Sequence, residues 1–399
     1  MSTSHLKKIR DLFFYNFFEN RIVYKIVCRY FPKDKLEINL DLTNKDQKKV
    51  LICYVPIWDS VLSTFHTAYY QQNQMILYFI SRGWCIDLCC CTDVRALNRF
   101  KDRSYDLLIG QGPLYRLLCE KIEVSKKVLY YTENNAEIVK AKYQERIRYF
   151  KERHPKISIK RAITRIGFFT YKDFELSDEI ILMSSKFNAM SFKPFFDNVY
   201  TLNVNAICNP NYEFNLTELD LKISKFNFVV FGCAGFIHKG IDILCDAFRL
   251  LPDCQLNIYG MEKKEIGIYN KIKSINTHRH GTINVMSDTY INEVINKNSF
   301  VILNSCSEGM ASGVATCMMH GLIPIVTKES GFNQSPVIVE LDDYKIESIV
   351  KTVKMLISMS DAEILNLRYK AFKYARSRFS IEEFTRNFFM IMDDICSGK

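Results

Sequence analysis

The sequence predicts an α/β protein of two doubly wound, Rossmann-type domains that face a cleft. Short apolar runs alternate with helical stretches over residues 49–184, and the alternation restarts over 226–326. The runs are apolar at nearly every position, which is typical of parallel strands covered on both faces. Between the two series, residues 204–225 lose this rhythm and contain Asn and Pro. A chain of 399 residues has the length expected of two domains.

The first series predicts five strands and two helices in regular order. The expected strands are residues 50–55, 84–90, 105–109, 127–131 and 179–184. The expected helices are residues 68–82 and 94–100. The preceding segment is basic and rich in aromatic residues, and it predicts one or two helices with an apolar face.

The second series predicts a similar unit with three helices after it. The expected strands are residues 226–231, 255–259, 283–285, 300–305 and 323–326. The expected helices are residues 241–251, 290–296, 312–320, 346–358, 361–377 and 381–396. We therefore expect five segments: a leader (1–45), an acceptor-side domain (46–205), a linker (206–225), a ligand-binding domain (226–378) and a closing helix (379–399).

Composition narrows the class of protein. Hydrophobic residues make up 48% of the chain, but no apolar run approaches the 18 residues that suggest a membrane-spanning helix. The first residues lack a small-residue cleavage site, so we expect a cytoplasmic protein without a signal peptide. None of the 14 cysteines has zinc-ligand spacing. Free thiols in a reducing compartment, without a metal, are the expectation.

Positive charge is concentrated in one segment of the chain. The net charge is +10, and residues 140–165 hold ten basic residues opposed only by Glu145 and Glu152. A basic face suits an anionic membrane surface or a phosphorylated acceptor, which would make the protein peripheral at the inner face of the cell membrane. Nucleic acid is not expected, because no binding motif accompanies the charge. The alternative is a solvated basic helix.

Glu308 is the first candidate site residue. It follows the expected strand 300–305 and precedes the expected helix 312–320. Ligands of parallel sheets bind beyond the carboxyl ends of the strands, beside helix N-termini. A carboxylate among small residues suits a sugar hydroxyl next to a phosphate. The alternative is an ordinary loop glutamate.

Lys239 is the second candidate. It lies between the expected strand 226–231 and the expected helix 241–251, in a turn that contains Gly235 and Gly240. Glycines allow the backbone to approach a ligand, and a lysine ammonium beside a helix N-terminus favours an anion. This combination indicates a diphosphate site. The alternative is a tight turn with a solvated lysine.

These residues resemble the nucleotide-sugar-binding half of retaining glycosyltransferases with the two-domain GT-B fold. The resemblance rests on the turn ending in Lys239-Gly240, on Glu308-Gly309, on Pro324–Val326 and on Ser330-Gly331. It is good over residues 226–335 and weaker over 48–205. Within the first half, the stretch VLYYTEN and the pair Glu145 and Arg148 resemble bacterial surface-polysaccharide transferases, which build lipopolysaccharide or capsule.

The resemblance implies transfer of a sugar from a UDP- or GDP-sugar to a glycan or lipid-linked glycan, with retention of configuration. Lys239, with Gly235 and Gly240, would bind the donor diphosphate, so neither a metal nor a cofactor is expected. Glu308 would hold sugar hydroxyls. The amides of Gly309, Met310 and Ala311 would bind sugar or phosphate.

The chain departs from the family pattern at two positions. Ala234 stands where the family often has an arginine, five residues before the lysine. Thr316 stands where a second glutamate usually binds the ribose, so only a hydroxyl remains for ribose binding. Because of both departures, the resemblance does not fix which nucleotide is bound, and a homologue without catalytic activity stays open.

Three residues of the first half are further candidates. His66 precedes the first expected helix and is a candidate catalytic group, with a structural role as the alternative. Glu133 and Asn134 follow the strand 127–131 and are candidates for the edge of a cleft. Two other functions stay open: a nucleotide-sugar epimerase of the same fold, and a non-catalytic nucleotide-binding or scaffold homologue.

Overall fold

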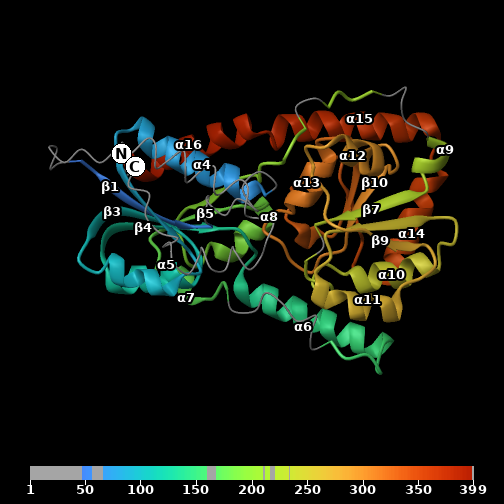
Figure 1. Ribbon diagram of the computed structural model, residues 1–399, viewed down its shortest axis with the longest axis horizontal. Coiled ribbons are helices and arrows are strands. Elements are labelled where there is room, and N and C mark those ends of the chain that lie inside the picture. The colour runs from blue at the N-terminus through green and yellow to red at the C-terminus, as the bar shows by residue number, and fades with distance from the viewer. Residues whose placement is uncertain are drawn as a thin grey trace, which may run out of the picture. The chain divides into compact units, whose positions relative to one another are not determined.

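The computed structural model describes residues 47–55, 66–159, 168–209, 212–215, 221–232 and 234–397. The predicted leader, residues 1–45, lies outside them. The described chain forms two six-stranded parallel sheets with helices between the strands, which confirms the predicted fold class (Figure 1). Whether the two sheets face a cleft stays a prediction.

The first sheet has the order β2-β1-β3-β4-β5-β6. Its strands are β1 (Lys49–Tyr54), β2 (Cys85–Cys90), β3 (Ser104–Gly110), β4 (Glu123–Tyr131), β5 (Glu179–Leu182) and β6 (Val199–Thr201). The larger helices in this part of the chain are α4 (Thr67–Ser81), η1 (Val94–Arg99), α5 (Gly112–Lys121) and α6 (Ala136–Arg153), and short turns form α7 (Lys172–Glu175), α8 (Lys186–Ala189) and η2 (Met190–Phe192). All five predicted strands are confirmed. Strand β6, which has only three residues, and helix α5 were not predicted.

The second sheet has the order β12-β11-β10-β7-β8-β9. Its strands are β7 (Asn227–Phe231), β8 (Gln255–Tyr259), β9 (Thr277–Arg279), β10 (Phe300–Leu303), β11 (Ile323–Val326) and β12 (Val339–Glu340). Its helices are α9 (Leu221–Ser224), α10 (Ile241–Arg249), η4 (Lys263–Glu265), α11 (Ile266–Ile272), α12 (Asp288–Tyr290), η5 (Ile291–Ile295), α13 (Ser312–Met318), η6 (Lys328–Ser330), α14 (Ile346–Ser358), α15 (Asp361–Arg378) and α16 (Ile381–Ser397).

One predicted strand of this sheet is wrong. Residues 283–285 form no strand, and the edge strand is β9, which pairs with β8 through Leu256 and Thr277. An edge strand is covered on fewer sides, so β9 carries the exposed side chains of His278 and Arg279 instead of an apolar run. The predicted helix 290–296 is α12 continued by one π-helical turn, η5.

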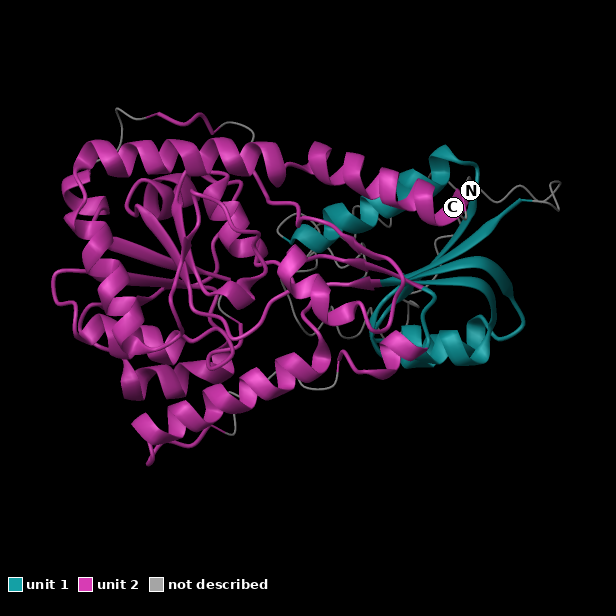
Figure 2. Cartoon of the chain, turned by 180° about the vertical axis from the view of Figure 1, so that it is seen from behind, with its two compact units in different colours: residues 1–129, 176–178 teal, residues 130–175, 179–399 magenta. Residues whose placement is uncertain are grey.

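Clustering of contacts divides the chain into two units (Figure 2). The first unit is residues 1–129 with 176–178, and the second is residues 130–175 with 179–399. Helix α6 therefore belongs to the second unit, although it precedes the predicted linker by more than fifty residues. The predicted domain bounds were drawn from the sequence rhythm and stay a prediction.

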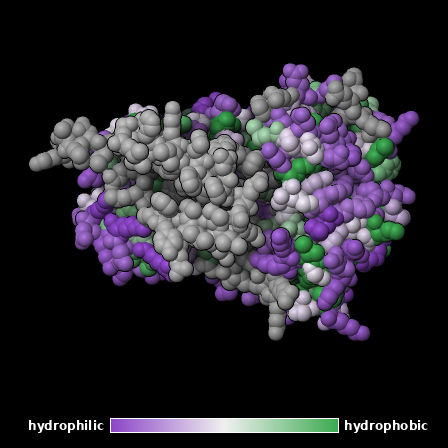
Figure 3. Space-filling model, in the orientation of Figure 1, coloured by the Kyte–Doolittle hydropathy of each residue, from purple (hydrophilic) through white to green (hydrophobic). Residues whose placement is uncertain are grey.

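Among the described residues, no helix is both long enough and apolar enough to span a bilayer. The described part of the face in Figure 3 is mostly hydrophilic, with small and separate hydrophobic patches.

Candidate functional site

Two segments of the second unit form the site. The lysine turn (residues 234–240) follows β7, and the glutamate loop (residues 306–311) follows β10. Strands β7 and β10 are parallel neighbours, with Phe228 opposite Phe300. Their carboxyl ends therefore meet at one edge of the sheet, which brings the lysine turn against the glutamate loop.

The structure brings Lys239 and Glu308 together. The Lys239 Nζ lies 3.2 Å from the Glu308 Oε1, and the two residues are only 8% and 7% exposed. Ser305 at the end of β10 donates its hydroxyl to the same carboxylate oxygen over 2.9 Å. A buried ion pair with a third hydrogen bond holds both functional groups in a defined orientation.

His238 fastens the lysine turn to the glutamate loop. Its carbonyl accepts the amide of Cys306 at 2.8 Å, and its imidazole Nε2 hydrogen bonds to the carbonyl of Ser307. The same Nε2 lies 3.9 Å from the Glu308 Oε1. His238 is 1% exposed, so its imidazole is in contact with the glutamate loop and not with solvent.

Two glycines shape the lysine turn. Gly240 caps α10 with a φ of 66°, and a Cβ built on it would lie 2.3 Å from the carbonyl oxygen of Asn304. Gly235 has a φ of 102°. Both values favour glycine, and the contact at Gly240 leaves no room for a side chain.

The sequence analysis missed Glu265. This buried carboxylate accepts the amides of Gly235 and Phe236 at 3.0 and 2.8 Å, so the Gly235 amide is occupied within the chain. Burial raises the pKa of Glu265, and the two amides oppose that rise. The one signal in the sequence was the Glu-x-x-Glu spacing of Glu262 and Glu265, which forms a capping box.

Among the described residues, the glutamate loop leaves the amides of Ser307, Gly309 and Met310 without a hydrogen-bond partner. The amides of Glu308 and Ala311 donate to the carbonyls of Glu329 and Ser330 at 2.9 and 3.2 Å. The amides of Gly309 and Met310 have no partner within the described part of the chain. Of the three amides predicted to bind sugar or phosphate, the structure thus engages Ala311 and leaves Gly309 and Met310 available.

The glutamate loop is held from both sides. Ser184, after β5, donates its hydroxyl to the Gly309 carbonyl at 2.6 Å, and Asn188 donates to the Glu308 carbonyl at 3.3 Å. On the other side, Gly331 has a φ of 83°, and a Cβ built on it would lie 1.6 Å from the Gly309 carbonyl oxygen. The path of the loop therefore depends on a glycine at 331.

The remaining predicted site residues of the second unit have internal partners. Thr316 is 2% exposed, and its hydroxyl oxygen accepts the Ile207 amide at 3.2 Å, so its ribose role stays a prediction. The Glu133 carboxylate accepts the Asn134 amide at 3.0 Å and the Ser307 hydroxyl at 3.4 Å. Glu133 and Asn134 therefore lie beside the glutamate loop, where they help to support it.

His66 lies in the first unit, as the N-cap of α4. Its Nδ1 accepts the amide of Ala68 at 3.1 Å, which is a structural role of the N-cap kind. Its predicted catalytic role stays a prediction.

Three cations of the basic segment are engaged within the chain, and its residues 160–165 lie outside the described part of the structure. Lys142 lies 3.1 Å from a Glu329 carboxylate oxygen, and Arg153 forms ion pairs with Asp242 and Asp246 of α10. Arg146 is only 3% exposed. The expectation of an outward basic face is wrong for Arg146, which is buried, and for Arg153, whose charge is paired with two carboxylates of α10; Lys142 keeps 40% of its side chain exposed.

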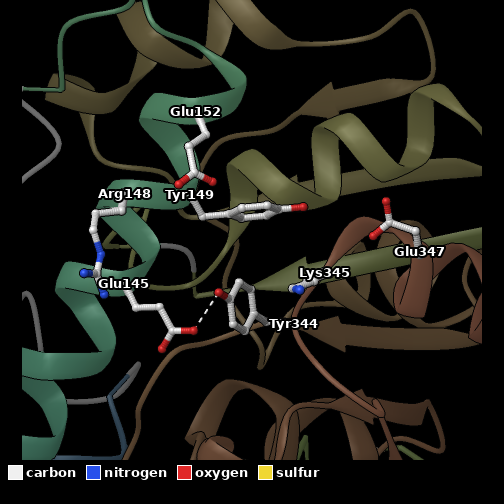
Figure 4. Close-up of a pocket in the computed structure, with 7 residues that line it drawn as sticks. All are labelled: Glu145, Arg148, Tyr149, Glu152, Tyr344, Lys345 and Glu347. Carbon is white, nitrogen blue, oxygen red and sulfur yellow. Dashed lines mark hydrogen bonds between the residues drawn. The ribbon is translucent and has the colours of Figure 1, made fainter.

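A pocket of about 600 Å³ lies between α6 and the start of α14 (Figure 4). Its lining is two tyrosines and five charged residues: Glu145, Arg148, Tyr149, Glu152, Tyr344, Lys345 and Glu347. The Tyr344 hydroxyl donates to the Glu145 carboxylate at 2.7 Å, the dashed line of Figure 4. Burial is the main reason that the pKa of Tyr344 rises to about 12.

Neither a protein-family model nor a curated protein matches this sequence. Solved structures do match. Sucrose-phosphate synthase from Thermosynechococcus elongatus aligns with 88% of this chain and 100% of its own, at 11% identity and a TM-score of 0.61. HepE from Anabaena, solved with UDP and glucose, has the same coverages at 10% identity and a TM-score of 0.56.

WaaG, described as a glycosyltransferase involved in lipopolysaccharide biosynthesis, also aligns with 88% of this chain and 100% of its own, at 12% identity and a TM-score of 0.55. The longer protein TarM matches 74% of this chain at 15% identity and a TM-score of 0.49, and this chain spans 56% of it. The likenesses to the synthase, HepE and WaaG confirm the predicted GT-B fold.

Proposed function

We propose that this protein is a glycosyltransferase that moves a sugar from a nucleotide-sugar donor to a glycan or lipid-linked glycan, with retention of configuration. The observation that carries the proposal is the buried pair of Lys239 and Glu308 at the carboxyl edge of the second sheet, 3.2 Å apart. It joins a cation for a diphosphate to a carboxylate for sugar hydroxyls, in a fold shared with HepE and WaaG.

The chemistry needs charge stabilisation where the nucleoside diphosphate leaves. In the proposed mechanism the Lys239 ammonium and the free amides of Gly309 and Met310 supply it, in a site that excludes most water. Glu308, held by Ser305 and His238, accepts hydrogen bonds from the donor sugar and fixes its orientation. Glu308 positions the sugar, and the acceptor attacks from the side that the diphosphate leaves.

Two comparisons support finer assignments. HepE was solved with UDP and glucose, which favours UDP as the first nucleotide to try. The description of WaaG favours an acceptor of the bacterial surface-polysaccharide kind. Peripheral contact with an anionic membrane at the cytoplasmic face belongs to this proposal, carried by cations of the basic segment that remain exposed, such as Lys140.

A nucleotide-binding homologue without transfer is the second candidate. The observation that favours it is the Thr316 hydroxyl, which accepts a backbone amide inside the chain at the position where a ribose ligand was expected.

The first experiment measures thermal stabilisation of the protein by UDP, GDP, ADP and CMP. A ligand at 100 times its Kd adds about 2.7 kcal/mol to the free energy of unfolding. We expect one diphosphate to stabilise the wild type, and Lys239→Met to abolish that effect. Lys354→Met is the matched control, because Lys354 is an exposed lysine of the same unit.

Hydrolysis of the matching nucleotide sugar then separates the two candidates, since a transferase releases sugar slowly to water and a binding homologue does not. Stabilisation by none of the four nucleotides would remove the proposed donor site.

A further inference from the structure

Arg146 of α6 is a buried cation with unused hydrogen-bond donors. It is 3% exposed, and its Nη2 donates to the Ser305 carbonyl at 3.3 Å. Its guanidinium carbon lies 4.1 Å from the centre of the Tyr344 ring. Among the described residues, its Nη1 has no hydrogen-bond partner and no carboxylate forms an ion pair with it.

Such a group is costly unless something compensates it. Burying a guanidinium removes its hydration, and desolvation lowers the pKa of Arg146 for this reason. The contacts with the Ser305 carbonyl and the Tyr344 ring compensate only part of the lost hydration. An anion that accepts a hydrogen bond from Nη1 would repay more.

The unused Nη1 lies at the lysine turn. A Cβ built on Gly240 would lie 3.1 Å from it, so the absence of a side chain at 240 is what admits the guanidinium there. Gly240 is the N-cap of α10, a helix of nine residues whose N-terminus carries a partial positive charge. Lys239 is the preceding residue.

One residue connects Arg146 to the site already described. The Ser305 carbonyl accepts from Arg146, and the Ser305 hydroxyl donates to Glu308. Glu308 in turn contacts Lys239. All three charged groups are at least nine-tenths buried, and Ser305 connects them.

We propose that Arg146 supplies the second positive charge of the diphosphate site, donating from Nη1 to a phosphoryl oxygen beside Lys239. The nature of the ligand rests on the proposed function. The lysine turn itself carries no second cation, since residue 234 is alanine. The guanidinium comes from α6, 93 residues before Lys239 in the chain.

A purely structural role for Arg146 makes a different prediction. If the arginine only tethers α6 to the end of β10, its replacement changes stability and affects phosphate-containing and phosphate-free ligands alike. If it binds the diphosphate, the loss is confined to ligands that carry phosphate.

The test measures Kd by calorimetry for three probes: inorganic pyrophosphate, UDP and uridine. GDP and guanosine replace the last two if GDP is the nucleotide that stabilises the wild type. The neutral variant is Arg146→Gln, which keeps a donor for the Ser305 carbonyl, and Arg146→Met makes the same comparison if the glutamine variant does not fold. Arg146→Lys restores the charge. Arg148→Met is the control, since Arg148 is exposed on the same helix.

We expect the neutral variants to raise Kd for pyrophosphate and the nucleoside diphosphate about tenfold or more, the loss typical of one charge-assisted hydrogen bond, with the nucleoside unchanged. Lysine should recover part of the affinity, and Arg148→Met should match the wild type. Equal effects on diphosphate and nucleoside, or no effect on either, would overturn the inference and leave the proposed function standing. A wild type that binds neither pyrophosphate nor a nucleoside diphosphate would overturn both.

Discussion

Replacing Gly331 by alanine tests whether the path of the glutamate loop is essential. A Cβ at this position would lie 1.6 Å from the Gly309 carbonyl oxygen and 3.0 Å from the Met310 Cα. Contacts of a Cβ under 3.0 Å are essentially never seen, so the loop must retreat by about 1.4 Å at the Gly309 carbonyl. That movement would break the Ser184 hydrogen bond, which holds the same carbonyl at 2.6 Å.

The magnitude follows from three terms. The left-handed φ of 83° costs a residue with a Cβ about 1–2 kcal/mol, and overpacking in a buried site costs about 1–3 kcal/mol. The smaller conformational entropy of the unfolded alanine chain returns about 0.4–1 kcal/mol. We expect Gly331→Ala to lower the free energy of unfolding by about 1–4.6 kcal/mol. A misplacement of about 1 Å near the chemistry typically costs about 100-fold in rate, so donor hydrolysis should fall at least that far.

Urea unfolding measures the stability change, and donor hydrolysis with diphosphate binding measures the functional change. Gly281→Ala is the matched control, because a Cβ there meets no atom within 4 Å and Gly281 has no positive φ. The reasoning is refuted if the two variants differ by less than about 0.5 kcal/mol in stability and hydrolyse the donor equally fast.

Three further predictions concern buried polar groups. Burial lowers the pKa of His320 to about 4, below its usual 6.5, so the unfolded chain binds the proton more readily between these values. The free energy of unfolding should therefore fall by about 3 kcal/mol as pH drops from 6.5 to 4. In urea unfolding, His320→Gln should make stability depend less on pH over this range. The same pH dependence in the wild type and the variant would show that His320 is not the group responsible. Glu265→Ala should leave the buried amides of Gly235 and Phe236 without an acceptor. We expect the free energy of unfolding to fall by about 2–3 kcal/mol in thermal unfolding and diphosphate binding to weaken. An unchanged melting temperature would refute this. Arg368 is fully buried and donates to three carbonyls. Arg368→Met should therefore lower the free energy of unfolding by about 3–5 kcal/mol, whereas Arg386→Met, at an exposed position, should lower it by about 0.5 kcal/mol or less. Equal losses of stability would show that the carbonyl contacts do not matter.

The sequence by itself determined most of the second sheet and where the two main candidate site residues lie in it. Strands buried on both faces leave a continuous apolar run, so β7, β8, β10 and β11 were recognisable from neighbouring residues alone. The rule that ligands lie at the carboxyl ends of parallel strands then placed Lys239 and Glu308 together, and they are 3.2 Å apart. The edge strand β9 was not predicted, because a strand at the edge of a sheet does not need an apolar run.

Only the tertiary structure decided how the charged groups are used. Arg146 and Arg153 looked like members of a solvated basic face, and the fold buries the first beside Gly240 and pairs the second with Asp242, 89 residues away. Glu265 was not among the candidates, yet its carboxylate accepts two amides of the lysine turn. Periodicity records which residues a segment buries, since that depends on its own helix or strand geometry. The partner of a buried charge is set by chain that is distant in sequence and close in space, so no local pattern contains it.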